Sequence, residues 1–224
     1  MNLPRHHRKK RFAALAAFAL VTTAATAADT EEARWWLHVG AARVTFHDHS
    51  ALTLAGQPVS GAGAKASDST TAALEVGYAL TPHWSASATL GVPPTSRIDG
   101  TGTVASAGRF GEIKYGPLVL AMQYRWGAAG SIRPYAGAGA VYYRVLESRD
   151  GAIQGLDARS GWGSALQAGV EFPLGPRWGV FVDVKKILLK TTATGTLPAA
   201  GGPPVRARST LDPVVVHAGL HFSF

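Results

Sequence analysis

Three histidines lie near the two ends of the chain, and their side chains would come together if the first and last segments paired as strands. His38 lies near the start of the chain, and His217 and His221 lie close to its end. Imidazole is a common metal ligand, so these residues are candidates for a metal site. Hydrogen bonds between lumen histidines and carboxylates explain the same pattern without a metal ion. We favour this second interpretation and predict neither a metal nor a cofactor.

A second group of residues, His47-Asp48-His49-Ser50, has the residue types of a hydrolase that acts on lipid. A catalytic triad is defined by geometry rather than by adjacency in sequence. Residues two apart at the end of a strand share a face, so His47 and His49 can converge. No second cluster completes the set, and we therefore predict that the chain is not an enzyme.

The charge of the chain is concentrated at its N-terminus, where five basic residues precede an apolar run: Arg5, Arg8, Lys9, Lys10 and Arg11. The run, residues 12–21, leads to the small residues Ala25-Thr26-Ala27, in the order typical of a secretory signal peptide. It is shorter than the roughly 20 apolar residues that a membrane-spanning helix needs. We predict that residues 1–27 are removed and that residues 28–224 form a single outer-membrane domain.

Removal of this segment lowers the formal net charge from +8 to +3. No dense basic patch remains, so we predict no nucleic-acid partner. The chain contains no cysteine, which excludes a disulfide framework, a cysteine metal site and a lipid anchor attached to cysteine.

Hydrophobic side chains alternate with small or polar ones in eight segments: residues 34–46, 71–80, 84–92, 117–126, 133–145, 162–172, 178–185 and 214–224. Each is about as long as the 9–11 residues of a membrane-spanning strand. The connections alternate between short (81–83, 127–132, 173–177) and long (47–70, 93–115, 146–161, 191–210). This pattern predicts an all-β, eight-stranded, antiparallel, up-and-down transmembrane barrel with short periplasmic turns and long extracellular loops. The long connections, rich in Gly, Ala, Ser, Thr and Pro, predict mobile surface loops.

Tryptophans at the predicted periplasmic strand ends support this orientation: Trp35, Trp36, Trp84, Trp126 and Trp178. An indole ring prefers the membrane interface, where its apolar body faces lipid and its N–H faces water. We therefore predict an aromatic girdle at this end.

The alternation places ten polar residues inside the barrel: His38, Glu75, Gln123, Arg125, Gln167, Glu171, Asp183, Lys185, His217 and His221. Four of them, His38, Arg125, Glu171 and His221, lie toward the periplasmic end, where we predict a polar plug. Plain charge pairing within a closed barrel explains the same residues and is compatible with a plug, because unpaired buried charges are costly.

On the extracellular side of the predicted plug, the inward positions carry small side chains. They predict an apolar cavity there and an exit for apolar solutes through the barrel wall. Pro93 and Pro94 follow the third strand, and Pro117 opens the fourth. Proline lacks a donor for the strand ladder. We therefore expect any gap to lie between the third and fourth strands.

Several stretches, in order, resemble the outer-membrane protein W (OmpW) family: Val39-Gly40, Leu90-Gly91-Val92-Pro93-Pro94-Thr95, Ile113-Lys114-Tyr115, Arg133-Pro134-Tyr135-Ala136-Gly137-Ala138-Gly139, Gly161-Trp162-Gly163, Gln167-Ala168-Gly169-Val170, Leu211-Asp212-Pro213 and the terminal Phe224. The resemblance implies an eight-stranded barrel with a narrow apolar passage, which moves small hydrophobic molecules and releases them laterally into the membrane. It also suggests that Trp162 lines or gates the passage, although an outer girdle position explains this residue equally well.

The expected location is the outer membrane, with outer-membrane lipid, lipopolysaccharide and small hydrophobic solutes as partners. The aromatic ending at Phe224, similar to the C-terminal signal of outer-membrane proteins, predicts recognition by the barrel-assembly machinery. A structural, adhesive or receptor role without transport is the alternative. The long loops are poor in aromatic and large apolar residues, so they offer few anchors for a binding partner.

Overall fold

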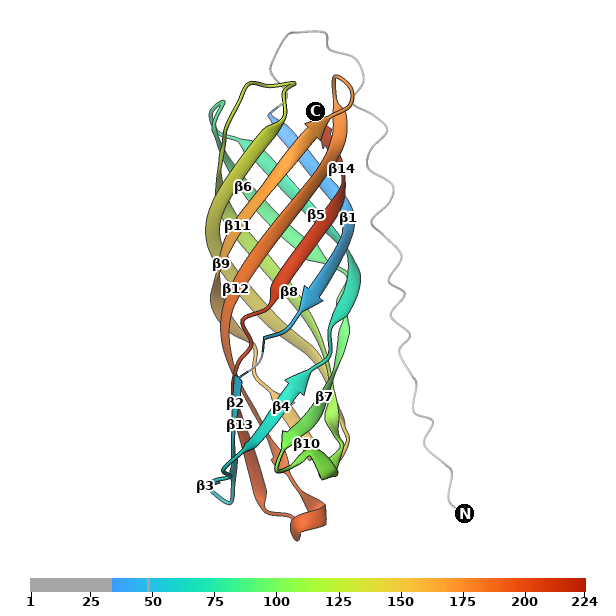
Figure 1. The fold of residues 1–224 in the computed structure, drawn as a ribbon, viewed down its shortest axis with the longest axis vertical. Helices are drawn as coiled ribbons and strands as arrows, with labels where there is room; N and C mark the ends of the chain where they lie inside the picture. Colours follow the sequence, from blue (N-terminus) through green and yellow to red (C-terminus); the bar gives the residue numbers. More distant parts are fainter. Residues whose placement is uncertain (1–33, 48) are drawn as a thin grey trace, which may run out of the picture. The chain divides into compact units, whose positions relative to one another are not determined.

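Eight antiparallel strands close into a barrel in the computed structural model, which describes residues 34–47 and 49–224 (Figure 1). The predicted signal peptide, residues 1–27, lies outside the described residues. The strands are β1 (Trp35–Thr45), β5 (Ser69–Ala79), β6 (Trp84–Gly91), β8 (Arg109–Arg125), β9 (Arg133–Asp150), β11 (Gly161–Pro173), β12 (Trp178–Thr196) and β14 (Val214–Ser223). Each pairs with the next, and β14 returns to β1, so the predicted eight-stranded barrel is confirmed.

The two faces of each strand differ as the alternation predicts. On β12, Val182, Val184 and Leu188 are exposed on the outer face, whereas Phe181 and Asp183 are buried on the inner face. Lipid cannot hydrogen-bond to the backbone, so a closed barrel with an apolar outer surface is one of the few structures that can cross a bilayer. Among the described residues, no helix is long and apolar enough to cross a membrane.

The two ends of the barrel have different connections, and we call them the short-turn end and the long-loop end. Both Trp35 and Phe224 lie at the short-turn end, where their backbones are hydrogen-bonded to each other. Four tryptophans are about half exposed there, in the predicted girdle: Trp35, Trp84, Trp126 and Trp178. Trp36 is an exception, because it is 3% exposed and faces the lumen. The girdle prediction was wrong for this residue, since the second of two adjacent strand residues must face the opposite side.

The connections at the long-loop end contain further strands, which continue the wall of the barrel (Figure 1). They are β2 (His49–Leu54), β3 (Gln57–Pro58), β4 (Ala62–Ala66), β7 (Thr95–Gly102), β10 (Gln154–Ala158) and β13 (Pro204–Thr210). Two single turns of 3₁₀ helix, η1 (Ala105–Ala107) and η2 (Pro198–Ala200), complete these connections. The sequence analysis predicted long mobile loops here from their composition and did not predict these strands. Composition does not show the alternation in stretches such as residues 205–210, where Arg206 and Arg208 are more exposed than Val205 and Ala207.

Candidate functional site: a two-part lumen

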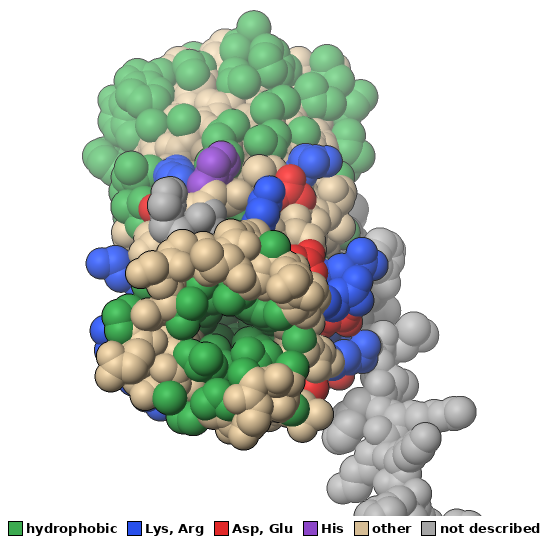
Figure 2. Space-filling model, turned by 60° about the horizontal axis from the view of Figure 1, so that its bottom comes forward, with side chains coloured by type: hydrophobic (Ala, Val, Ile, Leu, Met, Phe, Trp, Pro, Cys, Tyr) green, Lys and Arg blue, Asp and Glu red, His purple; other side chains and the backbone are tan. Residues whose placement is uncertain are grey.

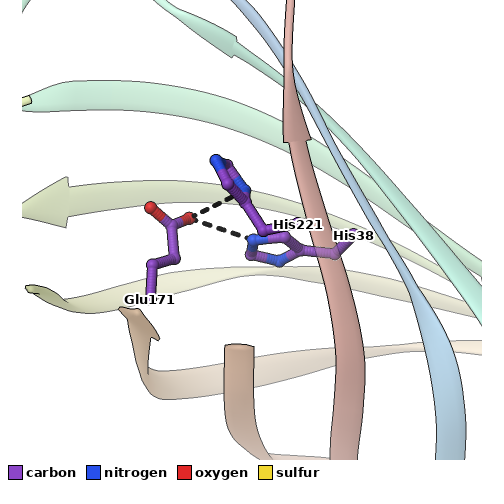
Figure 3. A group of neighbouring side chains, drawn as sticks. All are labelled: His38, Glu171 and His221. Carbon is purple, nitrogen blue, oxygen red and sulfur yellow. Dashed lines mark hydrogen bonds and ion pairs between the residues drawn. The ribbon is translucent and has the colours of Figure 1, made fainter. Parts of the chain in front are cut away.

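A single carboxylate oxygen joins four strands near the short-turn end. Glu171 Oε1 on β11 lies 2.7 Å from Arg125 Nη1, 3.0 Å from His38 Nε2 and 3.6 Å from His221 Nδ1. Figure 3 shows both histidine side chains directed at this carboxylate. The structure thus brings together the four residues of the predicted plug.

Aromatic rings fix the positions of these side chains. The guanidinium carbon of Arg125 lies 4.0 Å from the centre of the Trp36 ring, a cation–π contact. The His38 ring stacks on Phe181 with 3.9 Å between the ring centres. Trp36 in turn lies over Gly77 on the neighbouring strand, and a Cβ atom at Gly77 would collide with its indole ring.

A second group of charges lies next to the first, on its side toward the long-loop end. Lys185 Nζ contacts Asp183 Oδ1 at 2.6 Å and Glu75 Oε2 at 3.1 Å. Two amides complete the group: Gln123 Nε2 donates to Glu75 at 2.7 Å, and Gln167 Nε2 donates to Asp183 at 2.7 Å.

Arg125 Nη2 joins the two groups by donating to Gln123 Oε1 at 3.0 Å. We call the connected set the polar network: His38, Glu75, Gln123, Arg125, Gln167, Glu171, Asp183, Lys185 and His221. The network satisfies charges that would be costly if they were buried without partners.

A metal site is the other chemistry that these residues suggest. One ligand atom each from His38, Glu171 and His221 lies within 4.8 Å of the others. However, Arg125 already contacts the same Glu171 oxygen at 2.7 Å, and its positive charge opposes a cation there. His217, the third histidine of the sequence-based hypothesis, packs against Phe181 and is not part of this group.

Between the polar network and the long-loop end, the lumen is apolar. Its buried side chains form one cluster, which we call the apolar upper lumen: Val44, Phe46, Ala66, Tyr115, Val119, Val141, Tyr143, Ala165, Ile187, Leu189 and Leu211. Three aromatic rings follow one another, with 6.1 Å between the centres of Phe46 and Tyr115 and 5.3 Å between those of Tyr115 and Tyr143. Figure 2 shows the long-loop end hollowed, with hydrophobic side chains lining the hollow.

These aromatic residues were missed as site residues, although a signal for them exists in the sequence. Tyr115 lies four residues before Val119 in the inward row of β8, and Tyr143 lies two residues after Val141 in the inward row of β9. Our predicted fourth strand began at Pro117, so Tyr115 was assigned to a loop.

The barrel wall is interrupted beside the apolar upper lumen. The ladder between β6 and β8 ends at the pair Leu90–Leu118, and the ladder between β7 and β8 begins only at Thr95–Lys114. Pro93 and Pro94 occupy the interval, and a backbone bond from Tyr115 N to Pro94 O, 3.2 Å long, crosses it. Because proline has no N–H to donate, continuous pairing cannot form in this interval.

Trp162 lies on the outer face of β11, with 68% of its surface exposed, and its ring packs against Tyr142 at 4.9 Å between centres. Trp162 therefore lies on the outer surface of the barrel wall and does not line the lumen. In the barrel order one strand, β9, separates β11 from β8 at the interruption.

The residues considered for hydrolysis do not show a catalytic arrangement in the described part of the chain. Ser50 Oγ is hydrogen-bonded to Ser209 Oγ at 2.8 Å and to the carbonyl oxygen of Ala64 at 3.1 Å. Asp48 and the side chain of His49 lie outside the described residues.

Comparisons with known proteins agree with this architecture. The model of the OmpW family matches residues 31–224. The dibenzothiophene metabolism operon protein PahQ of Pseudomonas aeruginosa is 37% identical over 194 residues, which cover 87% of this chain and 90% of PahQ. The outer membrane protein AlkL of Ectopseudomonas oleovorans is 30% identical over 77% of this chain and 74% of its own length. The crystal structure of OprG from Pseudomonas aeruginosa, 22% identical, superimposes with a TM-score of 0.80 over 86% of this chain and 96% of OprG.

Proposed function

Since this chain belongs to the OmpW family, we propose that it takes up small hydrophobic molecules passively from the cell surface and releases them into the outer membrane. The family consists of outer-membrane barrels rather than enzymes, and this chain is an outer-membrane protein. In the proposed orientation, the short-turn end faces the periplasm and the long-loop end faces the medium. Recognition of Phe224 by the assembly machinery and removal of residues 1–27 are part of the same proposal.

The single observation that carries the proposal is the abrupt change in lumen chemistry. An apolar solute that enters at the long-loop end meets the rings of Phe46, Tyr115 and Tyr143. Below them it meets Lys185, Glu75 and Asp183, each at most 2% exposed and held in ion pairs. To pass farther, the solute would have to separate these ion pairs in a space with little water, where charges attract strongly. Escape through the wall avoids that cost.

The proposed exit is the interval in the wall at Pro93 and Pro94. Val92 and Leu90 flank it on the outer surface and are more than half exposed, so the exit opens among apolar side chains. From Trp84 in the girdle to Pro93 the strand rises about 23 Å along the membrane normal at a tilt of about 40°. This places the exit within the outer part of the apolar band.

Aromatic hydrocarbons are the proposed substrate class. The row of aromatic rings in the upper lumen offers edge-to-face and stacking contacts to a flat aromatic solute. PahQ is named as a protein of a dibenzothiophene metabolism operon, which supports the same class.

Uptake by whole cells tests the proposal. Cells that express the chain should accumulate dibenzothiophene faster than cells that lack it, whereas glucose uptake should be the same in both. Equal dibenzothiophene uptake would refute the transport proposal. If binding of cells to surfaces were lost at the same time, the adhesive alternative would be favoured.

A further inference from the structure

Above the apolar band, the outer wall of the barrel carries cationic side chains on β12, on β13 and on the connection between β10 and β11. The outer row of β12 runs from Trp178 in the girdle through three valines, Lys186 and Leu188 to Lys190, and the Lys186 ammonium is held by the carbonyl oxygen of Asp212. The rise from Trp178 to Leu188 along the membrane normal is about 25 Å, the height of the apolar band of an outer-membrane barrel. Lys190 therefore stands immediately outside the hydrocarbon layer.

Strand register places two arginines beside this lysine. Thr192 on β12 pairs with Arg208 on β13, and the backbone N–H of Arg159 bonds to the carbonyl oxygen of Thr192 at 3.0 Å. Paired residues of adjacent strands share a face, so Arg159, Thr192 and Arg208 form one row on the outer wall. The two arginines are about 10 Å apart at Cα, two strand spacings, and Lys190 lies two residues below the centre of the row.

The three cations border a groove of about 300 Å³, whose lining also includes Ser160, Thr191, Thr192, Ser209 and Thr210. Asp157 and Arg206 lie one row farther from the membrane, on either side of Thr194. Their opposite charges leave the positive charge concentrated at the level of the groove.

These cations differ from those on another part of the external wall. Arg97 and Arg109 share Glu112, and Arg149 pairs with Glu147 at 2.8 Å. By contrast, Arg159, Lys190 and Arg208 are exposed and have no ion pair with any described residue. Their charge is therefore available to a ligand outside the chain.

We propose that this groove binds the phosphate groups of lipid A, the anionic glycolipid of the outer leaflet. Guanidinium groups bind phosphate with paired N–H donors, and an ammonium group adds a point charge. The groove lies at the depth where lipid A carries its phosphates, directly outside the hydrocarbon layer. We call Arg159, Lys190 and Arg208 the phosphate triad.

Binding of lipid A to the refolded, purified protein in detergent micelles tests the proposal. In the variant Arg159→Ala/Lys190→Ala/Arg208→Ala, the affinity for bisphosphorylated lipid A should fall about 100-fold, since each cation near an anionic lipid surface contributes roughly fivefold. The matched control, Arg97→Ala/Arg109→Ala/Arg149→Ala, removes the same charge from paired positions and should change the affinity by less than about threefold. Arg159→Lys/Arg208→Lys retains the charge and should retain most of the binding.

Heat-modifiable migration on gels establishes that each variant is folded before binding is measured. Lipid A without its phosphates should bind equally to the natural chain and to the triad variant. The proposal would be overturned if the triad variant and the control lost affinity equally, or if removal of the phosphates left the affinity of the natural chain unchanged. Displacement of lipid A by inorganic phosphate at constant ionic strength would also contradict it, because the groove would then be a site for free anions.

Discussion

The lower and upper halves of the lumen share four strands, β1, β8, β11 and β12, but have opposite chemistry. On β12, the inward residues Asp183 and Lys185 belong to the polar network, and the next two inward residues, Ile187 and Leu189, belong to the apolar upper lumen. The change takes two residues, about 7 Å of strand. The comparison shows that a barrel can hold ion pairs at one end of its lumen and an apolar lining at the other without any change of fold.

The two halves should also respond differently to substitution, and the largest effect is expected in the polar network. Lys185→Met removes the cation that contacts Glu75 and Asp183 and leaves two buried carboxylates without it. We expect the free energy of unfolding, measured in urea and detergent micelles, to fall by about 3–5 kcal/mol.

Its neighbour Lys186 provides the matched control, because its ammonium group donates to the carbonyl oxygen of Asp212 outside the network. Lys186→Met removes this hydrogen bond but also takes a charge off the lipid-facing surface, so the free energy of unfolding should fall by no more than about 1 kcal/mol. Equal losses for the two variants would show that the network does not contribute more to stability than one hydrogen bond outside it.

In the apolar upper lumen, a new charge should impair uptake. Leu189→Asp places a hydrated carboxylate among Ile187, Tyr143 and the other side chains of the cluster. We expect dibenzothiophene uptake to fall about tenfold, which corresponds to a barrier raised by about 1.4 kcal/mol.

Leu189→Met keeps the position apolar and should retain uptake within about twofold, because cores tolerate this replacement with little loss. Heat-modifiable migration separates loss of folding from loss of uptake. A folded Leu189→Asp protein with undiminished uptake would exclude the upper lumen as the pathway.

The smallest effect is expected at the long-loop end, outside both halves of the lumen. The backbone N–H groups of Gly155 and Leu156 each donate to Asp150 at 2.9 Å and hold the pKa of its carboxyl below its ordinary value. A lowered pKa in the folded state stabilises the connection at pH values above the ordinary aspartate pKa, and this contribution is lost as the pH falls below it.

Asp150→Asn should therefore accelerate hydrogen exchange of the Gly155 and Leu156 amides a few-fold at neutral pH. Amides in the ladder between β5 and β6 serve as the internal control and should not change. Unchanged exchange at Gly155 and Leu156 would show that the carboxylate does not order this turn.

Most of the architecture follows from the alternation of hydrophobic side chains with small or polar ones along the sequence, whereas the contacts across the lumen do not. Alternation alone assigned Glu75, Gln123 and Lys185 to the interior, where all three are buried. It could not show that Glu171 meets His38, because these residues are 133 positions apart and meet only through the stagger of the closed barrel.

Two other features escaped prediction for local reasons. Trp36 was assigned to the girdle with Trp35 by residue type, although adjacent strand residues face opposite sides. The strands of the long-loop end were read as loops because glycine and threonine dominate stretches such as residues 191–196. Pairing with β13 orders that stretch, and such long-range pairing is not visible in local composition.

A reversible closure of the wall tests lateral release most directly. A Cβ atom built on Gly116 lies 4.0 Å from Pro93 Cβ, within the roughly 3.5–4.5 Å range of a disulfide. The variant Pro93→Cys/Gly116→Cys, in a chain that otherwise has no cysteine, would link the two sides of the proposed exit. Ala88→Cys/Leu120→Cys links the same two strands where they are already paired and serves as the control.

We expect oxidation of Pro93→Cys/Gly116→Cys to lower dibenzothiophene uptake and a reducing agent to restore it, whereas the control pair should have no effect in either state. Undiminished uptake by the fully oxidised Pro93→Cys/Gly116→Cys protein would contradict lateral release between β6 and β8.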